Sequence, residues 1–556
     1  MKITLVPRLD RSTLFRTPWW IPIVVLSAAL LCGAGLHGEE AKKGSTDATA
    51  TSSTATPAPK PANMTERELY LLNEIELLKN RLEELESRVA GSSGKPAPPA
   101  MPTPVEAGTV ANAATPVLPT SNAAAPRQEA QPQARPAKPE PFTFADFSWL
   151  TGNDRTKESP IDTKVFTGEF RVDADYVQDF NHPQDNTIGG SSEVFRSGEV
   201  QLTQLGIGGN FHWDHVRGRL MTQFGMYSQT TPRNDASPGR GQWNLDNAYR
   251  YLSEAYGGYH FDKMYGINVD AGIFMSYVGL FSYYQFDNWA YQPSYVSSNT
   301  PWFFNGVRVQ FFPSEKLKIE PWFINGWQSY GKFNRAPGVG GQILWRPNGS
   351  VSIVSNNYWG RDTLGVPGRN RFHTDDSIQV KYYDKPDKFI SKGAFTVTID
   401  AGCEYGGGVV CKGGNAAKPS QYFLGFMVYN RWWFHKDLFA FTVGGGGIDN
   451  PGRYLVLLPP INGATAFTGT PYFTENPGDP YKAWDASATF DYMPKQFITW
   501  RFEYNHRASN VPYFSGQGGI TPPGGNVFPA GSFVPGFAPD LRKQENRLII
   551  AILVKL

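Results

Sequence analysis

The chain lacks the features of a nucleic-acid-binding protein and of a helical membrane protein. Charged residues make up only 18% of its 556 residues and the formal net charge is +2, whereas nucleic-acid-binding domains carry a strongly basic surface. Beyond the N-terminal region, no segment approaches the roughly 20 apolar residues of a membrane-spanning helix. The longest good apolar run covers residues 548–554. If the chain spans a membrane, it therefore does not do so with helices.

Motifs for catalysis and for cofactor binding are also missing. No nucleotide-binding glycine motif, nucleophile elbow or zinc-ligand spacing is visible. No Lys-Ser/Thr pair follows the glycine runs at 406–408 and 444–447, so we interpret both as glycines at strand ends or bends. His212 and His215 flank an expected tight turn and have no third metal ligand nearby in the sequence. We expect no catalytic residue, no cofactor and no metal.

Glycine, proline and aromatic residues, in contrast, are plentiful. The 57 Gly, 44 Pro and 14% aromatic residues suit an all-β protein with many turns. From residue 164 onward, alternating segments are joined by connections of two different lengths. Short polar connections lie at 214–215, 313–316, 347–350, 435–437 and 493–496, and long ones at 181–197, 231–251, 280–301 and 509–545. Bacterial outer-membrane barrels show this asymmetry, because their periplasmic turns are short and their extracellular loops are long.

The alternating segments number sixteen. They are expected at 164–180, 199–213, 216–230, 252–262, 266–279, 302–312, 317–330, 339–347, 351–358, 372–384, 394–404, 420–434, 438–448, 482–493, 497–508 and 546–556. An even number of strands places both chain ends on the periplasmic side. Sixteen strands leave a water-filled lumen, whereas eight would be filled by side chains. We therefore expect an all-β fold, a transmembrane antiparallel β-barrel of about sixteen strands.

Apolar and polar residues alternate along these segments, as a barrel with a lipid-facing exterior and a polar lumen requires. In the first segment the apolar face holds Phe166, Phe170, Val172, Ala174 and Tyr176, and the polar face holds Thr167, Glu169, Arg171, Asp173 and Asp175. The aromatic residues at 429–434 and 302–304 fit the girdles found at membrane interfaces. A soluble β-sandwich with one wet face is the alternative, but it has no need of such clusters.

The region before the barrel divides into five parts. Residues 1–38 form a signal peptide with a basic start and an apolar core from Trp19 to Cys32. Residues 39–63 are a disordered linker, 64–90 a coiled-coil helix and 91–140 a linker rich in Ala and Pro. Residues 141–163 enter the barrel, which occupies 164–556. The segment before the barrel is expected in the periplasm.

The coiled coil rests on one heptad seam. Its apolar residues are Leu71, Ile75, Leu78, Leu82, Leu85 and Val89. Such a seam is fully buried only between helices, so it predicts a homo-oligomer, and a trimer by analogy with general porins. The alternative is a single amphipathic helix that packs on another surface.

Several stretches resemble the outer-membrane β-barrel porins of the OmpL-like porin-2 group. They are Asp270-Ala271-Gly272-Ile273-Phe274, Gly306-Val307-Arg308-Val309, Asn325-Gly326-Trp327 and Arg501-Phe502-Glu503-Tyr504-Asn505-His506. The resemblance covers most of 164–556 and implies passive passage of solutes without catalytic residues. The terminal Leu556 departs from the Phe that usually ends a barrel-assembly signal.

The expected function is that of an outer-membrane porin that lets small hydrophilic solutes diffuse through a water-filled barrel. Its partners would be outer-membrane lipid, lipopolysaccharide and those solutes, with no nucleic acid. Two alternatives remain open at this point. The barrel could anchor a structural tether of the envelope, or it could be an enzyme that acts on surface substrates, although barrel enzymes are usually smaller.

Two groups of residues are expected to shape the pore. Lumen-facing charges of both signs are predicted to line it, namely Glu169, Arg171, Asp173, Arg217, Arg219, Arg308, Arg501 and Glu503. The third long connection, 280–301, is predicted to fold inward as a constriction loop that carries Phe281, Tyr283, Tyr284, Phe286, Trp289 and Tyr291. A water-exposed loop this aromatic would favour aggregation. The alternative is a loop that lies over the barrel or between protomers.

Cysteine is scarce. If Cys32 leaves with the signal peptide, only Cys403 and Cys411 remain, in an oxidising compartment. They flank a glycine-rich bend and are predicted to form a disulfide, with two free thiols in adjacent strands as the alternative.

Overall fold

The computed structural model describes residues 79, 140–189, 193–233, 235, 237, 241–332, 334, 336–363, 365–452, 480–525, 527–529 and 532–556. The expected signal peptide, linkers and coiled coil lie outside these residues, apart from Lys79 and Glu140. None of the described helices is long and apolar enough to cross a membrane.

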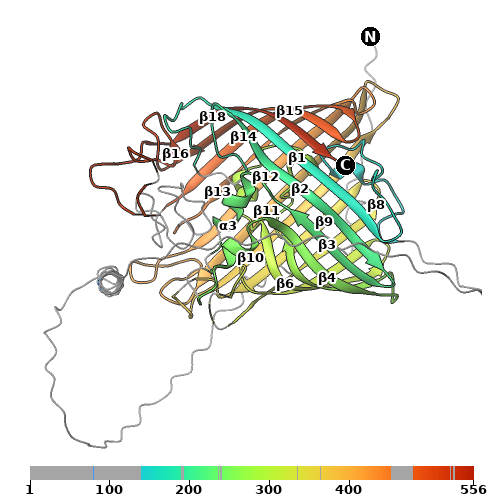
Figure 1. The fold of residues 1–556 in the computed structure, drawn as a ribbon, viewed down its shortest axis with the longest axis horizontal. Coiled ribbons are helices and arrows are strands. Elements are labelled where there is room, and N and C mark those ends of the chain that lie inside the picture. The colour runs from blue at the N-terminus through green and yellow to red at the C-terminus, as the bar shows by residue number, and fades with distance from the viewer. Residues whose placement is uncertain are drawn as a thin grey trace, which may run out of the picture. The chain divides into compact units, whose positions relative to one another are not determined.

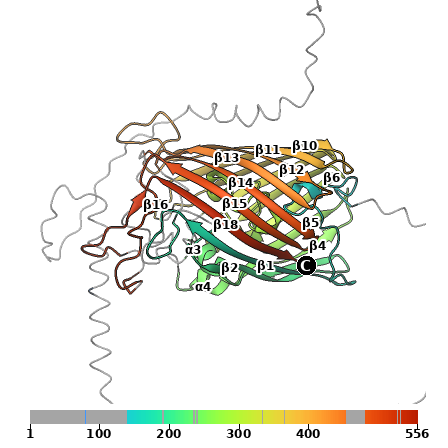
Figure 2. The same cartoon turned by 90° about the horizontal axis from the view of Figure 1, so that it is seen from above.

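Within the described residues, sixteen antiparallel strands close into a barrel (Figures 1 and 2). They are β1 (Phe166–Asp179), β2 (Val200–Trp213), β3 (Val216–Thr222), β4 (Leu252–Phe261), β5 (Ile267–Met275), β6 (Phe303–Ser314), β7 (Leu317–Ile324), β8 (Gly338–Asn348), β9 (Val351–Gly360), β10 (Asn370–Asp384), β11 (Ile390–Tyr405), β12 (Tyr422–Phe434), β13 (Phe439–Asp449), β14 (Lys482–Lys495), β15 (Ile498–Ser509) and β18 (Gln544–Lys555). The predicted all-β barrel of sixteen strands is confirmed.

The barrel closes between its first and last strands. β18 pairs with β15 on one side and with β1 on the other, where Arg171 lies opposite Lys555 and Val177 opposite Ile549. Closure leaves no strand edge unpaired, which is the condition for a sheet to exist in lipid. The short extra strands β16 (Phe514–Ser515) and β17 (Leu541–Arg542) form a separate pair in the last long loop.

The two ends of the barrel differ in the length of their connections. One end carries the short turns and the C-terminus, to the right in Figure 1, and we call it the short-turn end. The other carries the long loops and is called the long-loop end. The third long loop joins β5 to β6 and is called L3 (276–302). It contains the short helices η3 (Gln285–Asp287) and α5 (Tyr295–Ser298).

The predicted alternation decides which side chains face the lumen. In β15, Thr499, Arg501 and Glu503 are buried inside the barrel, whereas Trp500 and Phe502 are exposed on its outside. Successive side chains of a strand point to opposite faces, so one polar and one apolar face follow from the sequence pattern alone.

Three predicted strands were too long, and one of them, at 266–279, ends as β5 at Met275. The candidate at 216–230 ends as β3 at Thr222 and is followed by helix α3 (Tyr227–Arg233), with α4 (Leu245–Tyr249) further along the same loop. The candidate at 317–330 ends as β7 at Ile324. Most apolar residues beyond Thr222 and Ile324 pack inside the barrel instead of continuing the sheet, although Phe224 is exposed and still bridged to Leu205. Tyr227, for example, lies 4.4 Å from Tyr283 of L3, measured between ring centroids.

The aromatic clusters at 429–434 and 302–304 are only in part a membrane girdle. Tyr429 and Trp433 point into the barrel and are fully buried, while Trp432 faces outward between them. Trp302 and Phe304 are also buried. The prediction was wrong for these inward rings, because they alternate along the strands and pack against segments within the lumen.

The glycines at 444–447 were predicted at a strand end or bend. They lie instead within β13, so this prediction was wrong. A Cβ atom at Gly446 would lie 2.6 Å from the hydroxyl of Ser294 in L3, and one at Gly425 of β12 would lie 2.9 Å from Val296. These glycines let α5 pack directly on the backbone of the wall. The other run, 406–408, follows β11 in a bend with positive φ angles, as expected.

Candidate functional site

L3 lies inside the barrel and contacts its wall from several directions. Its buried rings join side chains of β12, β13 and β14 in one apolar cluster, and Phe286 and Tyr291 join a second cluster with β18 and β1. The inward residues of β18 in that second cluster are Ile549, Ala551 and Leu553. Residues 548–554 of the last strand are thus apolar on both faces, and L3 packs on their inner face.

Two charged residues of β15 hold the middle of L3 by its backbone. Arg501 donates to the carbonyl oxygens of Gln285 (3.0 Å) and Asn288 (2.6 Å). Glu503 accepts from the N–H groups of Tyr291 (2.6 Å) and Gln292 (2.9 Å). Both side chains are buried, so these charge-assisted bonds form away from water, where they are strong.

Further carboxylates fix L3 on either side of this point. The hydroxyl of Tyr291 donates to Asp173 of β1 (2.9 Å). Asp485 of β14 accepts from the hydroxyl of Ser294 (2.8 Å) and from the N–H of Tyr295 (2.9 Å). The hydroxyl of Tyr284 donates to Glu254 of β4 (2.8 Å), on the opposite part of the wall. L3 therefore reaches across the lumen.

The tip of L3 also carries a carboxylate, Asp287. It pairs with Arg171 (2.9 Å) and with Lys555 (3.1 Å). Burial raises the pKa of Asp287, but the two cations outweigh burial and hold that pKa at about 2. The tip therefore stays negatively charged at any physiological pH.

The lumen wall divides into two parts. We call β12–β15 with β18 the covered wall, because the middle of L3 lies on it. We call β2–β8 the open wall, although L3 contacts it at Tyr277 and Tyr284. Along the open wall and the neighbouring part of β1 run the cations Arg171, Arg217, Arg219, Arg308 and Lys318, and the carboxylates Glu169, Glu254, Asp270 and Glu320. Each of these cations is paired with a carboxylate, as Arg308 (3.0 Å) and Arg217 (3.3 Å) are with Asp270.

The predicted lumen residues all point inward, but they do not share one environment. Arg217 and Arg308 keep 28% and 14% of their side chains exposed. Asp173, Arg501 and Glu503 are buried beneath L3 and bind it. Of the predicted loop residues, Tyr284, Phe286, Trp289 and Tyr291 are buried, and Phe281 and Tyr283 are half-buried.

Sequence reasoning missed several inward charges of the covered wall. Arg431, Asp485 and Asp491 are buried, and Arg431 pairs with Asp491 at 2.8 Å. Strand alternation contains the signal for each of them. Arg431 was overlooked because it stands within the aromatic stretch interpreted as a girdle.

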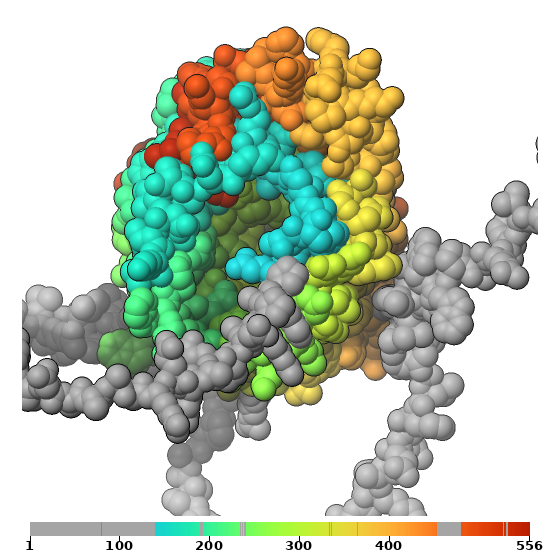
Figure 3. Space-filling model, turned by 90° about the vertical axis from the view of Figure 1, so that its right-hand side faces the viewer, coloured from blue at the N-terminus to red at the C-terminus, as the bar shows by residue number. Residues whose placement is uncertain are grey.

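The segment before β1 crosses the short-turn end of the barrel. Figure 3 views this end, where the segment, in cyan, lies across the opening and leaves a hollow beside it. The short helix η1 (Ser148–Leu150) brings in Trp149, whose indole N–H donates to the carbonyl of Gly349 in the β8–β9 turn (3.0 Å). The predicted segment at 141–163 thus lies at and inside the barrel mouth.

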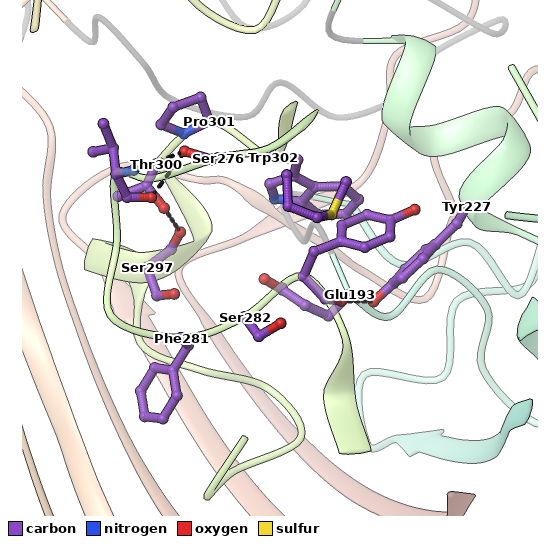
Figure 4. A pocket seen from close by; sticks show the side chains of 12 residues that line it. Glu193, Tyr227, Ser276, Phe281, Ser282, Ser297, Thr300, Pro301 and Trp302 are labelled. Atoms are coloured by element: carbon purple, nitrogen blue, oxygen red, sulfur yellow. Dashed lines mark hydrogen bonds between the residues drawn. The ribbon is translucent and has the colours of Figure 1, made fainter. Parts of the chain in front are cut away.

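A pocket lies where L3 meets the two preceding long loops. Its lining combines aromatic rings, hydroxyl groups and one carboxylate, and Figure 4 shows Glu193, Tyr227 and Trp302 among them. The carboxylate of Glu193 accepts from the side-chain amide of Gln292 (2.5 Å). L3 supplies much of the lining of this pocket, and the lining residue Glu193 also binds L3 at Gln292.

Cys403 and Cys411 form a disulfide across the bend that follows β11. Within the described residues, no group of three or more His, Cys, Asp or Glu residues is arranged to hold a metal ion.

Several solved structures are similar to this chain. They include OprB of Pseudomonas putida (TM-score 0.41, 10% identity, 71% of this chain and 94% of that chain). The anion-selective porin of Comamonas acidovorans gives a TM-score of 0.40 at 10% identity, over 70% of this chain and 99% of that chain. The channel DcaP of Acinetobacter baumannii gives 0.39 at 13% identity, over 72% and 99%.

No curated protein matches the sequence. The model of the beta-barrel porin-2, OmpL-like family matches residues 166–528, which is well over half of the chain. The match begins at the first strand and runs into the last long loop. The protein therefore belongs to the beta-barrel porin-2, OmpL-like family and is an outer-membrane porin, not an enzyme.

Proposed function

We propose that this porin passes small hydrophilic solutes by diffusion between L3 and the open wall. The observation that carries the proposal is the fixation of L3 across the lumen by Arg501 and Glu503, whose partners are backbone groups of the loop. L3 is then the constriction, and its aromatic residues serve to pack it on the covered wall.

The charges left along the passage have both signs, so we expect only weak ion selectivity. Rings of one sign make a pore selective for ions of the other sign. Here Asp270 lies between Arg217 and Arg308, and Glu169 binds Arg219 at 3.0 Å. A small solute with many hydrogen-bonding groups would meet paired charges and little net potential.

Single-channel recording in planar bilayers tests the proposal. Purified full-length protein should give discrete current steps that rise linearly with voltage. The reversal potential in a salt gradient should lie close to zero. Folded protein that inserts but gives no steps would contradict the proposal, and the barrel would then serve as an anchor for the N-terminal tether.

We also propose that the short-turn end faces the periplasm, together with the N-terminal segment. Short periplasmic turns and long surface loops are the rule in outer-membrane barrels, and they support this orientation. An epitope tag inserted after Gly524 should be labelled on intact cells. A tag at Lys495 should be labelled only after the outer membrane is opened, and the reverse pattern would refute the orientation.

The heptad seam at 71–89 supports a homotrimer held in part by a coiled coil. Replacing Ile75 and Leu82 with Asp would place charges in the seam and should reduce the oligomer to monomers in mild detergent. A trimer that survives the double substitution would mean that the barrels associate by themselves.

A further inference from the structure

The segment at 149–156, which we call the strap, is bound to the inside of the barrel at several points. The side-chain amide of Asn153 donates to the carbonyls of Lys495 (3.3 Å) and Ile498 (3.2 Å) and to the hydroxyl of Thr499 (3.1 Å). Asp154 accepts from Lys392 of β11 (2.5 Å). Asn153 and Asp154 are buried, so the strap is a part of the packed lumen and not a loose linker.

The strap also contacts the tip of L3. The N–H of Gly152 donates to the carbonyl of Asp287 (3.0 Å). Trp149 and Trp289 belong to the same buried apolar cluster. A Cβ atom at Gly152 would lie 2.4 Å from the carbonyl oxygens of Phe286 and Asn288, closer than van der Waals contact allows. Glycine at this position therefore lets the two segments meet backbone to backbone.

One buried guanidinium joins the strap, the loop and the wall. Arg431 of β12 donates to the carbonyl of Gly152 (2.7 Å) and to that of Trp289 (3.4 Å), and it pairs with Asp491 (2.8 Å). Asp491 also pairs with Arg501 (2.7 Å), which holds L3 further along. The strap and L3 are thus bound by the same network of paired charges. Each buried charge in it needs its partner, because an unpaired buried charge is strongly destabilising.

We propose that the strap is a second constricting element, which positions the tip of L3 and thereby sets the conductance of the pore. This inference rests on the constriction role of L3 proposed above. From the strand pattern alone, this segment was expected only to lead the chain into the barrel, whereas the proposal gives it a role in conductance.

The substitution Gly152→Val in the full-length protein tests the contact with L3. The added side chain forces the strap and the loop tip apart, so single-channel conductance should rise by roughly two-fold or less, with more current noise. The matched control is Gly257→Val on the outer face of β4, where a Cβ atom would meet nothing within 4 Å. Its conductance should equal that of the unaltered protein.

The substitution Asn153→Ala tests the strap from the other side. It removes three bonds to the β14–β15 region and leaves every contact with L3 in place. The strap keeps its bonds to Lys392 and Arg431 but loses this anchor, so it should shift within the mouth, and conductance should rise as for Gly152→Val. If Gly152→Val does not fold, this variant still gives the answer.

The outcomes separate the two proposals. Unchanged or lowered conductance in both strap variants overturns the role of the strap, while a deletion in L3 that still raises conductance leaves the proposed function intact. If neither the strap variants nor the L3 deletion changes the conductance of a folded channel, the constriction lies elsewhere and both proposals fail.

Discussion

The covered wall and the open wall have the same strand pattern but use their inward charges differently. Arg431, Arg501 and Glu503 of the covered wall are buried, and their partners include backbone groups of L3 or of the strap. Arg217 and Arg308 of the open wall remain partly exposed and share Asp270 within the sheet. Alternation thus states which residues face the lumen, and the inserted segments decide which of them meet water.

This difference has an energetic side. A charge buried without its partner is costly, whereas a partly exposed pair is screened and contributes little. Substitutions on the covered wall should therefore change the position of L3 and the stability of the barrel. Similar substitutions on the open wall should change the charge that a passing ion experiences.

The largest effect is expected from removing the loop that distinguishes the two walls. Deletion of residues 284–291 takes away the tip of L3 and its bonds to Arg501 and Glu503. Single-channel conductance should rise severalfold while the barrel still folds. Deletion of the exposed residues 412–418 in the β11–β12 loop is a control of similar size and should have no effect. Equal conductance in the two deletions would place L3 outside the conducting path.

Arg501→Gln should destabilise the covered wall. The substitution leaves Asp491 with one cation instead of two and frees the carbonyls of Gln285 and Asn288. Removing one partner of a buried ion pair costs roughly 3–5 kcal/mol. The temperature of unfolding in detergent should fall and the open-channel current should become noisier. Arg217→Gln on the open wall is the comparison. Arg217 is 28% exposed and its loss leaves Asp270 paired with Arg308, so both properties should change much less.

A moderate effect on selectivity is expected on the open wall. Replacing both Arg217 and Arg308 with Gln leaves Asp270 unpaired beside the passage. The reversal potential in a salt gradient should shift toward cation selectivity, with little change in conductance. Asp270→Asn should shift it in the opposite direction. No shift in either variant would mean that ions do not pass along this wall.

The docking of the strap should depend weakly on pH through Asp154. Burial raises the pKa of this carboxyl from 3.8 to about 6, against the attraction of Lys392 and with repulsion from Asp437. An acid with a raised pKa favours the docked state fully below its ordinary value and loses that contribution as pH rises through about 6. Current noise should therefore increase between about pH 4 and 6, and Asp154→Asn should remove this dependence. The same pH profile in that variant would rule out Asp154.

The smallest effect is expected at the disulfide, which belongs to neither wall. Cys403→Ser with Cys411→Ser opens a short closed loop, so the change in stability should be small and conductance should not change. Thiol counting on denatured, unreduced protein should find no free group from this pair. Two free thiols would show that the bond does not form in the mature protein.

The sixteen strands were predictable because apolar residues facing outward alternate with polar residues facing the lumen along each strand. Trp500, Arg501 and Phe502 show this alternation in three consecutive residues. The residues of the inserted segments were harder to predict. The bond from Arg431 to Gly152 joins positions 279 residues apart, and the packing surface for L3 formed by Ile549 and Leu553 looks like ordinary strand sequence. Local patterns carry no information on such pairs, because packing between distant segments decides them.

The glycines of β12 and β13 have one more consequence. Because Gly425 and Gly446 have no side chain, α5 lies against the backbone itself, and the loop is displaced toward one side of the cylinder. If solutes pass between L3 and the open wall as proposed, we expect an eccentric free cross-section, a crescent along β2–β8 instead of a central bore. A solute in a crescent slides along one surface for the length of the barrel, so its mobility depends on friction with Arg217, Arg308 and their neighbours more than on the width of the cylinder.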